Sequence, residues 1–430
     1  MTSSDPLAGL DDVVWSEVGH AYGPADDVPG LLKGLTSQDT ETRKECLYGL
    51  YSTIFHQGTG YEATALAVPF LARLALAAET SGRADIVDLL ASVAVGYDEA
   101  YLPNGVDPAA QRAEYEQLRS GRAQRMREFQ HRIAAARGAT PRQQQQLRRR
   151  IFDYEAKVRA ADDQLQAYAA VRSHVPMLRA LLAEDDAGLR ASVAYLVAWF
   201  PEEEAADSVA ALTQLLERED DPRVTATAII AVGLIGGSEL VPGLRRRLAS
   251  AEALERWAAA TALARLGDHS GQVARVLADT AVEPPEAPKS SELSGSSETP
   301  ENPDAPQEGR LVRFLDGDIR GYASLSLVLL ADSVTPEVFD AVSEGLARSS
   351  ETGAFTIAGA ALRLAFPAGP PERLPPFADL DDRQQRVVRV LAELRTQTWH
   401  WGDFTDIVQA WKLPTWRDTL RAYAGLPPLG

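Results

Sequence analysis

Apolar residues recur at helical spacing in six segments of the chain, each at a fixed distance after an arginine. The residue three positions after that arginine is Cys46, Ile86, Val193, Ala226, Ala259 or Ala323. The residue seven positions after it is Leu50, Leu90, Val197, Ile230, Leu263 or Leu327. Such spacing puts the side chains on one face of a helix, so the pattern predicts helices with a buried inner face.

A second helix is expected before each of these. A proline stands fourteen positions before the arginine in five segments, and Val209 takes that place in the other. The prolines are Pro29, Pro69, Pro176, Pro242 and Pro306. Proline suits the first position of a helix, where its missing N–H would have no partner. Each unit is therefore predicted to be a helix, a short turn and a second helix.

An acidic residue stands four positions before each arginine. The pairs are Asp39/Arg43, Glu79/Arg83, Asp186/Arg190, Glu219/Arg223, Glu252/Arg256 and Asp316/Arg320. Three of the arginines recur every 33 residues, a period typical of stacked helical arrays. The proline, turn acid and helix arginine together resemble the HEAT-repeat family, over about residues 27–96, 174–282 and 306–332. The resemblance implies that acid and arginine bond across neighbouring units as a structural ladder.

The predicted fold is an all-α solenoid of stacked HEAT-like helix–turn–helix repeats with an inserted antiparallel helical hairpin. We expect N-terminal repeats in residues 1–96, the basic, coiled-coil-like hairpin in 97–173, and central repeats in 174–282. A disordered, acidic, proline- and serine-rich loop is expected in 283–309, and degenerate repeats with a tryptophan-rich helical cap in 310–430. One degenerate unit is expected to start at Pro336.

The hairpin prediction depends on an apolar seam. Leu147, Ile151, Tyr154, Val158, Ala161, Leu165 and Tyr168 alternate at spacings of four and three, which indicates a coiled coil. A weaker seam, broken by Arg122, precedes it from Tyr115 onward. The sequence GATPRQ between the two predicts a turn, with Thr140 as a helix cap and Pro141 at the first helical position.

The charge of the hairpin is opposite to that of the remainder. Residues 108–160 carry +8, from 13 cationic and five acidic side chains, whereas the whole chain carries −18, which leaves −26 elsewhere. The arginines that could contact a partner protein or nucleic acid are Arg119, Arg122, Arg125, Arg127, Arg148, Arg149 and Arg150. The alternative interpretation is a solvated helical surface that folds back on the acidic array.

Two glycine-punctuated stretches near the N-terminus, GHAYGPADD and FHQGTGYEA, form a second candidate site. They carry His20, Tyr22, His56, Gln57 and Tyr61 as residues that could line a ligand loop. The alternative is that these side chains bond to nearby backbone within ordinary turns.

Catalytic signatures are lacking in the sequence. The six histidines show no metal-binding spacing, and the single Cys46 excludes an intramolecular disulfide, so we expect no enzyme activity, metal or cofactor. No run of 18 apolar residues suggests a membrane span, and a cytoplasmic location is expected.

The predicted function is a protein–protein interaction scaffold that binds an unidentified protein through the solenoid surface or the hairpin. An immunity or antitoxin role, in which the acidic array neutralises a basic toxin, is a special case of it. The alternative is a nucleic-acid-associated factor that contacts phosphates through the hairpin, for which affinity should depend steeply on salt.

Overall fold

The structure, a computed structural model, describes residues 5–135, 141–285 and 311–427. It consists of helix pairs stacked on one another, with two minimal β-hairpins, so the predicted all-α class of stacked helical repeats is confirmed. The described residues divide into two compact units. The first unit holds residues 5–97 and 106–208, and the second holds 98–105, 209–285 and 311–427.

Eight helices of the described chain lie within the first unit. They are α1 (Val28–Gly34), α2 (Thr40–Thr53), α3 (Glu62–Leu76), α4 (Arg83–Val95), α5 (Pro108–Ala135), α6 (Pro141–Arg172), α7 (Val175–Leu178) and α8 (Ala187–Val197), and α9 (Ala205–Leu216) crosses into the second unit. The predicted core positions Leu50, Leu90 and Val197 are fully buried. Cys46 is only half-buried. Its Sγ fills the space beside Gly34, where a Cβ atom would lie 2.1 Å away from it.

Two short β-hairpins lie in the N-terminal part of this unit. Strand β1 (Gly19–His20) pairs with β2 (Gly23–Pro24), and β3 (Phe55–His56) pairs with β4 (Thr59–Gly60), both antiparallel. Gln57 and Gly58 connect β3 and β4 with φ angles of 50° and 76°, the left-handed geometry that a tight two-residue hairpin turn requires.

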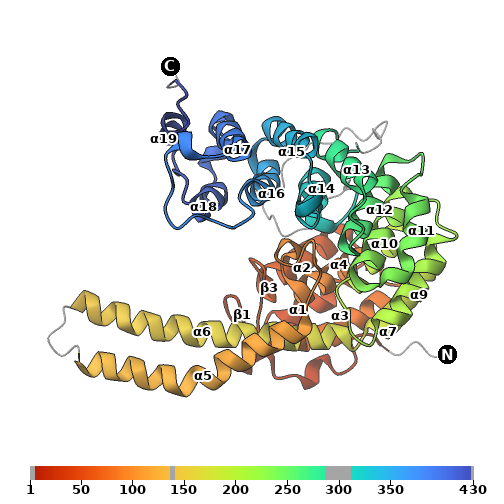
Figure 1. Ribbon diagram of the computed structural model, residues 1–430. Coiled ribbons are helices and arrows are strands. Elements are labelled where there is room, and N and C mark those ends of the chain that lie inside the picture. Colours follow the sequence, from red (N-terminus) through yellow and green to blue (C-terminus); the bar gives the residue numbers. More distant parts are fainter. Residues whose placement is uncertain (1–4, 136–140, 286–310, 428–430) are drawn as a thin grey trace. The chain divides into compact units, whose positions relative to one another are not determined.

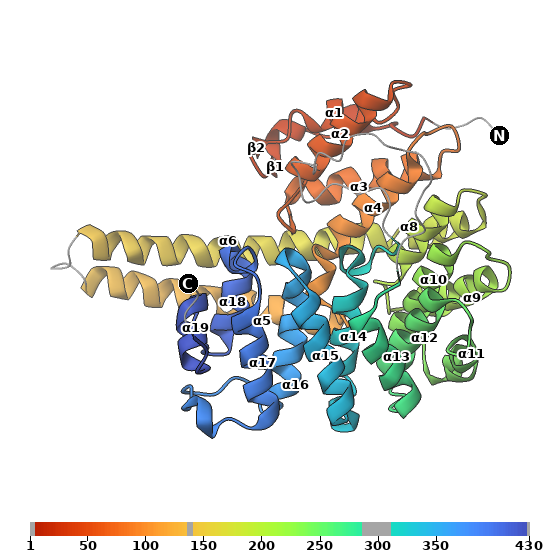
Figure 2. The same ribbon diagram turned by 90° about the horizontal axis from the view of Figure 1, so that it is seen from above.

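The two long helices of the predicted hairpin run side by side and antiparallel, and α6 begins at Pro141 as predicted (Figure 1). The second half of α6 is part of the core of the first unit rather than a separate insertion. It packs on α3 and α4, where Val158, Ala167 and Val171 are buried, and Gln164 Nε2 donates to the Ala94 carbonyl at 2.6 Å. The distal halves of α5 and α6 extend beyond α3 and α4 (Figures 1 and 2).

The second unit is a double row of helices (Figure 2). One row consists of α10 (Pro222–Ile235), α12 (Ala253–Arg265), α14 (Ile319–Val328), α16 (Phe355–Ala365) and α18 (Gly402–Ala410). The other consists of α11 (Val241–Arg247), α13 (Gly271–Val282), α15 (Pro336–Arg348), α17 (Asp382–Glu393) and α19 (Arg417–Tyr423). The predicted core positions Ile230, Leu263 and Leu327 are buried between the rows.

Short 3-10 helices cap or connect these elements. They are η1 (Leu10–Asp12), η2 (Trp15–Glu17), η3 (Asp98–Ala100), η4 (Arg179–Ala183), η5 (Ser238–Leu240), η6 (Phe314–Gly317), η7 (Ala331–Ser333), η8 (Glu351–Ala354), η9 (Phe377–Asp379) and η10 (Thr398–His400).

The segment 98–105, expected in the hairpin insertion, belongs instead to the second unit. Asp98 Oδ2 accepts from the Leu315 N–H at 3.0 Å, and the Asn104 carbonyl accepts from Arg265 Nε at 2.6 Å.

The predicted loop at 283–309 falls almost wholly outside the described residues, as does Pro306. Helix α13, which precedes this segment in the sequence, packs directly on α14, which follows it. Helix α15 begins at Pro336, as predicted. The expected tryptophan-rich cap continues the double row, because α17 packs on α15 and α18 packs on α16. Trp399 and Trp411 are buried there, whereas Trp401 and Trp416 are exposed.

Three of the turn arginines donate to backbone carbonyls of their own turn. Arg43 donates to the Ser37 carbonyl at 2.8 Å, and Arg256 donates to the Ser250 carbonyl at 3.0 Å. Arg190 donates to the carbonyls of Glu184 and Asp185, at 2.9 and 2.8 Å. The end of the preceding helix leaves carbonyls without intrahelical partners, and these lie nearer than the next unit.

The other three arginines of the expected ladder bond in two different ways. Arg223 Nη2 pairs with Asp221 of its own turn at 2.9 Å, two positions away in the sequence. Bonds to a neighbouring helix pair occur at Arg83, whose Nη2 lies 3.4 Å from Glu184 Oε1, and at Arg320, which donates to the Gly345 carbonyl. Bonds between neighbouring helix pairs therefore occur at Arg83 and Arg320, and the acid–arginine ladder itself stays a prediction.

Two acids of the pairs, Asp39 and Asp186, act as helix caps. Asp39 accepts from the Thr42 N–H and Asp186 from the Leu189 N–H, at 2.9 and 3.1 Å. In two copies the capping acid is a different residue. Asp221 caps α10 and Asp318 caps α14, two positions after Glu219 and Asp316 respectively.

Candidate interaction surfaces

The root of the α5–α6 hairpin is clamped by an acidic loop of the first unit. Arg172, near the end of α6, contacts Glu202, Glu203 and Glu204, at 3.0 Å for Glu202 and 2.9 Å for Glu204. Arg112, in the first turns of α5, also pairs with Glu202. One carboxylate therefore joins both arms of the hairpin, and its side chain is only 15% exposed.

Tyr168 completes this clamp. Its hydroxyl lies 3.1 Å from both Glu202 Oε2 and the Trp199 carbonyl, and its ring packs on Phe200 with centroids 4.9 Å apart. Burial raises the pKa of Tyr168, and the nearby Glu202 carboxylate raises it further, so the hydroxyl remains a donor. The root of the hairpin is thus held by buried hydrogen bonds as well as by charge.

Farther along the hairpin, several of its basic residues are neutralised by its own acids. Arg122 makes a two-pronged bond across the arms to Glu155, with N–O distances of 2.6 and 2.9 Å. Lys157 reaches Glu114 across the arms at 3.7 Å. The bond to Arg122 lowers the pKa of Glu155. Within α5, Arg119 pairs with Glu116 and Arg125 with Glu128. The two pairs that cross the arms, Arg122–Glu155 and Lys157–Glu114, link the two helices at a fixed register.

The surplus positive charge lies in the distal half. No acidic side chain in the described part of the chain lies within ion-pair distance of Arg127, Arg132 or Arg149, all of which are exposed. The ring of Phe152, one turn after Arg149 on α6, is 65% exposed. We call Arg127, Arg132, Arg149 and Phe152 the distal surface. Arg148 and Arg150 lie in the same helix, with side chains outside the described ones.

The two candidate ligand loops meet in the first unit. The ring of Tyr22 lies 5.4 Å from that of His56 and 6.3 Å from that of His20, centroid to centroid. His20 Nε2 lies 2.9 Å from Asp27 Oδ1, and its Nδ1 accepts from the Tyr22 N–H at 3.0 Å. The alternative of local bonding therefore holds for His20. Gln57 is exposed at the β3–β4 turn, and Tyr61 precedes α3.

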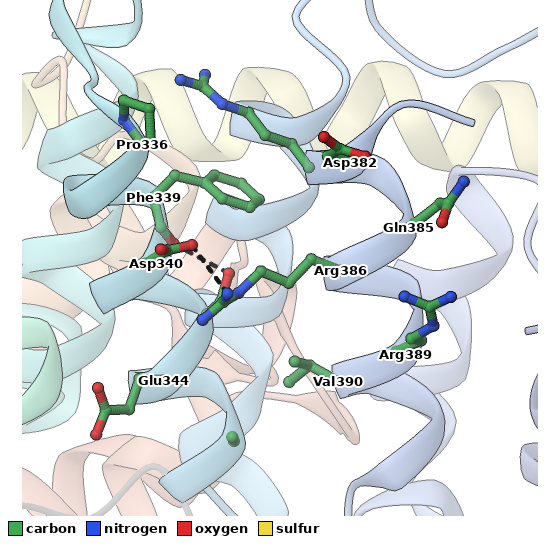
Figure 3. Close-up of a pocket in the computed structure, with 12 residues that line it drawn as sticks. Pro336, Phe339, Asp340, Glu344, Asp382, Gln385, Arg386, Arg389 and Val390 are labelled. Atoms are coloured by element: carbon green, nitrogen blue, oxygen red, sulfur yellow. Dashed lines mark hydrogen bonds and ion pairs between the residues drawn. The ribbon is translucent and has the colours of Figure 1, made fainter.

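A trough in the second unit lies between α15 and α17 (Figure 3). Asp340 and Glu344 line its α15 side, and three arginines line its α17 side, with the ring of Phe339 between them (Figure 3). Arg386 reaches Asp340 at 3.0 Å, across the trough. Arg383 stacks on Phe339 and donates to the Val334 carbonyl at 3.0 Å, and Arg389 lies 5.0 Å from the Phe377 ring. Each arginine of the trough therefore already contacts an acid, a carbonyl or an aromatic ring of the second unit.

Part of the second unit is similar to a known family of helical repeats. A family model described as HEAT repeats matches residues 209–291, which include α10 to α13. The chain contains HEAT repeats. A search of curated proteins gave no match. A crystal structure of an engineered protein from the Northeast Structural Genomics Consortium covers 93% of this chain and 97% of its own, at 18% identity and a TM-score of 0.27, and at that score it carries no argument.

Within this HEAT-repeat architecture, two kinds of site are not found among the described residues. No helix of residues 5–135, 141–285 and 311–427 combines the length and apolar character that a membrane span needs. In the same ranges, no three His, Cys, Asp or Glu side chains are grouped so that they could hold a metal ion.

The sequence did not predict the contacts of Glu202 and Glu204 at the hairpin root. The run Glu202–Glu204 is visible as three consecutive acids after an aromatic pair, but nothing in the sequence links it to Arg112, 90 positions earlier. Asp163 was missed as well. Burial raises its pKa to about 6, with further contributions from Asp162 and Glu62. Both features depend on how α6 packs against helices that are distant in the sequence.

Proposed function

We propose that this protein is a non-catalytic scaffold that binds a partner protein through the distal surface of its α5–α6 hairpin. The observation that carries the proposal is the contrast along the hairpin. Arginines near the root and in the middle are paired with acids, whereas Arg127, Arg132 and Arg149 have no acidic partner in the described part of the chain. HEAT repeats generally serve as protein-interaction scaffolds, which agrees with this role.

The chemistry of the distal surface favours a protein partner. Arginine and aromatic residues are enriched where binding energy concentrates in protein interfaces, and Phe152 adds an exposed ring beside Arg149. Nucleic-acid binding without sequence preference uses rows of stacking aromatics along a basic groove. Here Tyr154 and Tyr168, two other aromatics of α6, are engaged internally, at the Leu118 and Trp199 carbonyls. The partner we infer has an acidic surface.

The experiment is a pull-down from lysate of the source cells, with and without nuclease. The test variant carries Glu at Arg127, Arg132 and Arg149, and the matched control carries Glu at Arg246, Arg275 and Arg363, which are exposed on the second unit. We expect the unmodified chain and the control variant to retain a discrete protein in the presence of nuclease. The test variant should retain about tenfold less of that protein. Retention that nuclease removes would identify a nucleic-acid partner instead, and equal losses in both variants would overturn the proposal.

The immunity or antitoxin role is a different form of the scaffold function, in which the acidic array and not the hairpin binds the partner. It requires a basic partner, and the support for it is the charge of −26 on the chain outside residues 108–160. Co-expression with a basic toxin encoded beside the gene should protect the host cells if this form is correct. A gene without such a neighbour would count against it.

A further inference from the structure

An exposed aromatic surface lies where the two β-hairpins meet. Tyr22 is 69% exposed, although its backbone is held on both sides of the turn. The Ala21 N–H donates to the Thr53 carbonyl at 3.1 Å, and the Tyr22 N–H donates to His20. The His20 ring is in turn tied to Asp27. These bonds fix the backbone of Tyr22 at the surface, and its mostly exposed ring presents an apolar face to a ligand.

A second aromatic side borders Tyr22. The His56 ring lies 5.4 Å away at an interplanar angle of 59°, so the two rings form an open corner. Tyr61 directly follows β4, the strand that pairs with the His56 strand, and it is half-buried. Burial, together with the nearby Tyr22 hydroxyl, raises the pKa of Tyr61. We call Tyr22, His56 and Tyr61 the aromatic corner. Its members come from the two hairpins and the N-terminal end of α3.

Carboxylates flank the aromatic corner. Glu62, next to Tyr61, is exposed and accepts from the Gly19 N–H at 3.3 Å. Asp163 of α6 lies near it, because β4 and α6 are in contact and the charge of Glu62 acts on Asp163. Arg159 is the cation that acts on Asp163, and it is exposed. The negative charge beside the aromatic corner therefore exceeds the positive charge.

We propose that the aromatic corner is a docking site for a cationic side chain, an arginine or a lysine, presented by a partner protein. Negative faces of aromatic rings and adjacent carboxylates are the two groups that attract an ammonium or a guanidinium. A guanidinium can stack on Tyr22 while its N–H groups reach Glu62. The absence of a metal-type grouping of His, Cys, Asp and Glu among the described residues separates this site from a metal site.

This inference goes beyond the hairpin function, since it concerns a different surface and the opposite charge. The probe is the pentapeptide Gly-Gly-Arg-Gly-Gly, titrated into the full chain while the ring signals of Tyr22 and His56 are followed by NMR. The control peptide carries citrulline in place of arginine, which keeps the shape and removes the charge. We expect saturable shifts with the arginine peptide and no response to the citrulline peptide.

Variants distinguish docking from general attraction to an acidic protein. Tyr22→Leu should weaken binding about fivefold, whereas Tyr22→Phe should retain it, because the ring face and not the hydroxyl attracts the cation. Glu62→Gln should weaken binding more than Glu45→Gln, the same charge change at an exposed position about 12 Å along α2 from Thr53. Equal effects of these two changes, or a Tyr22→Leu variant that binds normally, would overturn the proposal. Charge reversal on the hairpin should leave this titration unchanged, so the two proposals fail separately.

Discussion

Arginine lines both the distal half of the α5–α6 hairpin and the α15–α17 trough, yet the two surfaces use it differently. In the trough, Arg383, Arg386 and Arg389 each lie against an acid, a carbonyl or an aromatic ring. On the hairpin, Arg127, Arg132 and Arg149 have no such acid in the described part of the chain. Whether a surface arginine is free to bind a partner therefore depends less on the number of arginines than on the acids that the fold places opposite them.

The hairpin root should give the largest effect, because there Glu202 and Arg172 are paired largely away from water. Glu202→Ala removes the carboxylate shared by Arg112, Arg172 and Tyr168 and leaves Arg172, only 22% exposed, without that acid. We expect a loss of about 2–3 kcal/mol in the free energy of unfolding, measured by chemical denaturation. Glu203→Ala is the control. Glu203 contacts the same arginine but is 85% exposed, so about 0.5 kcal/mol is expected. Equal losses would mean that the clamp does not depend on Glu202.

A second test concerns Asp163, a half-buried carboxylate near two other carboxylates, Asp162 and Glu62. The pKa of Asp163 is raised to about 6, so the folded state binds more protons than the unfolded state between about pH 4 and 6. The free energy of unfolding should therefore fall as pH rises through that window. Asp163→Asn removes the cost and should stabilise the protein by about 1 kcal/mol above pH 7, after allowance for the half-exposed position. The gain should vanish near pH 4, as measured by thermal unfolding at each pH. A gain that is equal at both pH values would show that ionisation is not its cause.

A third test removes an acid from the trough between α15 and α17. Asp340→Asn removes the acid that faces Arg386 and makes this arginine resemble those of the distal hairpin. Because both partners are about half exposed, we expect a loss of only about 0.5 kcal/mol in stability. The variant should elute from a heparin column at a higher salt concentration than the parent. An unchanged elution position would mean that pairing does not govern how an arginine meets a polyanion.

The smallest effect on stability is expected where an acid is added to the hairpin. Ala123→Glu places a carboxylate one helical turn before Arg127, at the spacing at which the two side chains meet. Unfolding should be almost unaffected, since the site is exposed, but retention of the partner protein in the pull-down should fall. Ala123→Gln is the control for side-chain size. If both variants retain the partner equally, pairing of Arg127 does not matter for binding.

The sequence by itself determined the elements and their inner faces. Apolar residues three and four apart predicted the buried positions of α2, α4, α8, α10, α12 and α14, and proline predicted the starts of α6 and α15. The same expectation was wrong for Pro69, which lies inside α3 and not at its start. Both signals are local, because helical spacing and the rigid proline ring act within one or two turns. The distal hairpin arginines were also visible, as an excess of charge in one stretch of the chain.

Only the tertiary structure decided which charges meet. Glu202 reaches Arg112 across 90 residues, and Tyr22 meets His56 across two separate hairpins, so no periodic pattern records either contact. The regular spacing of Asp186 and Arg190 likewise did not record that the guanidinium bonds to carbonyls of its own turn.

The structure also decided that Asp221 and Asp318 cap their helices in place of Glu219 and Asp316, since a cap depends on the backbone angles of one residue. Ionic and capping contacts depend on side-chain positions within a few ångströms, and the ionic contacts between distant helices arise only when those helices pack together.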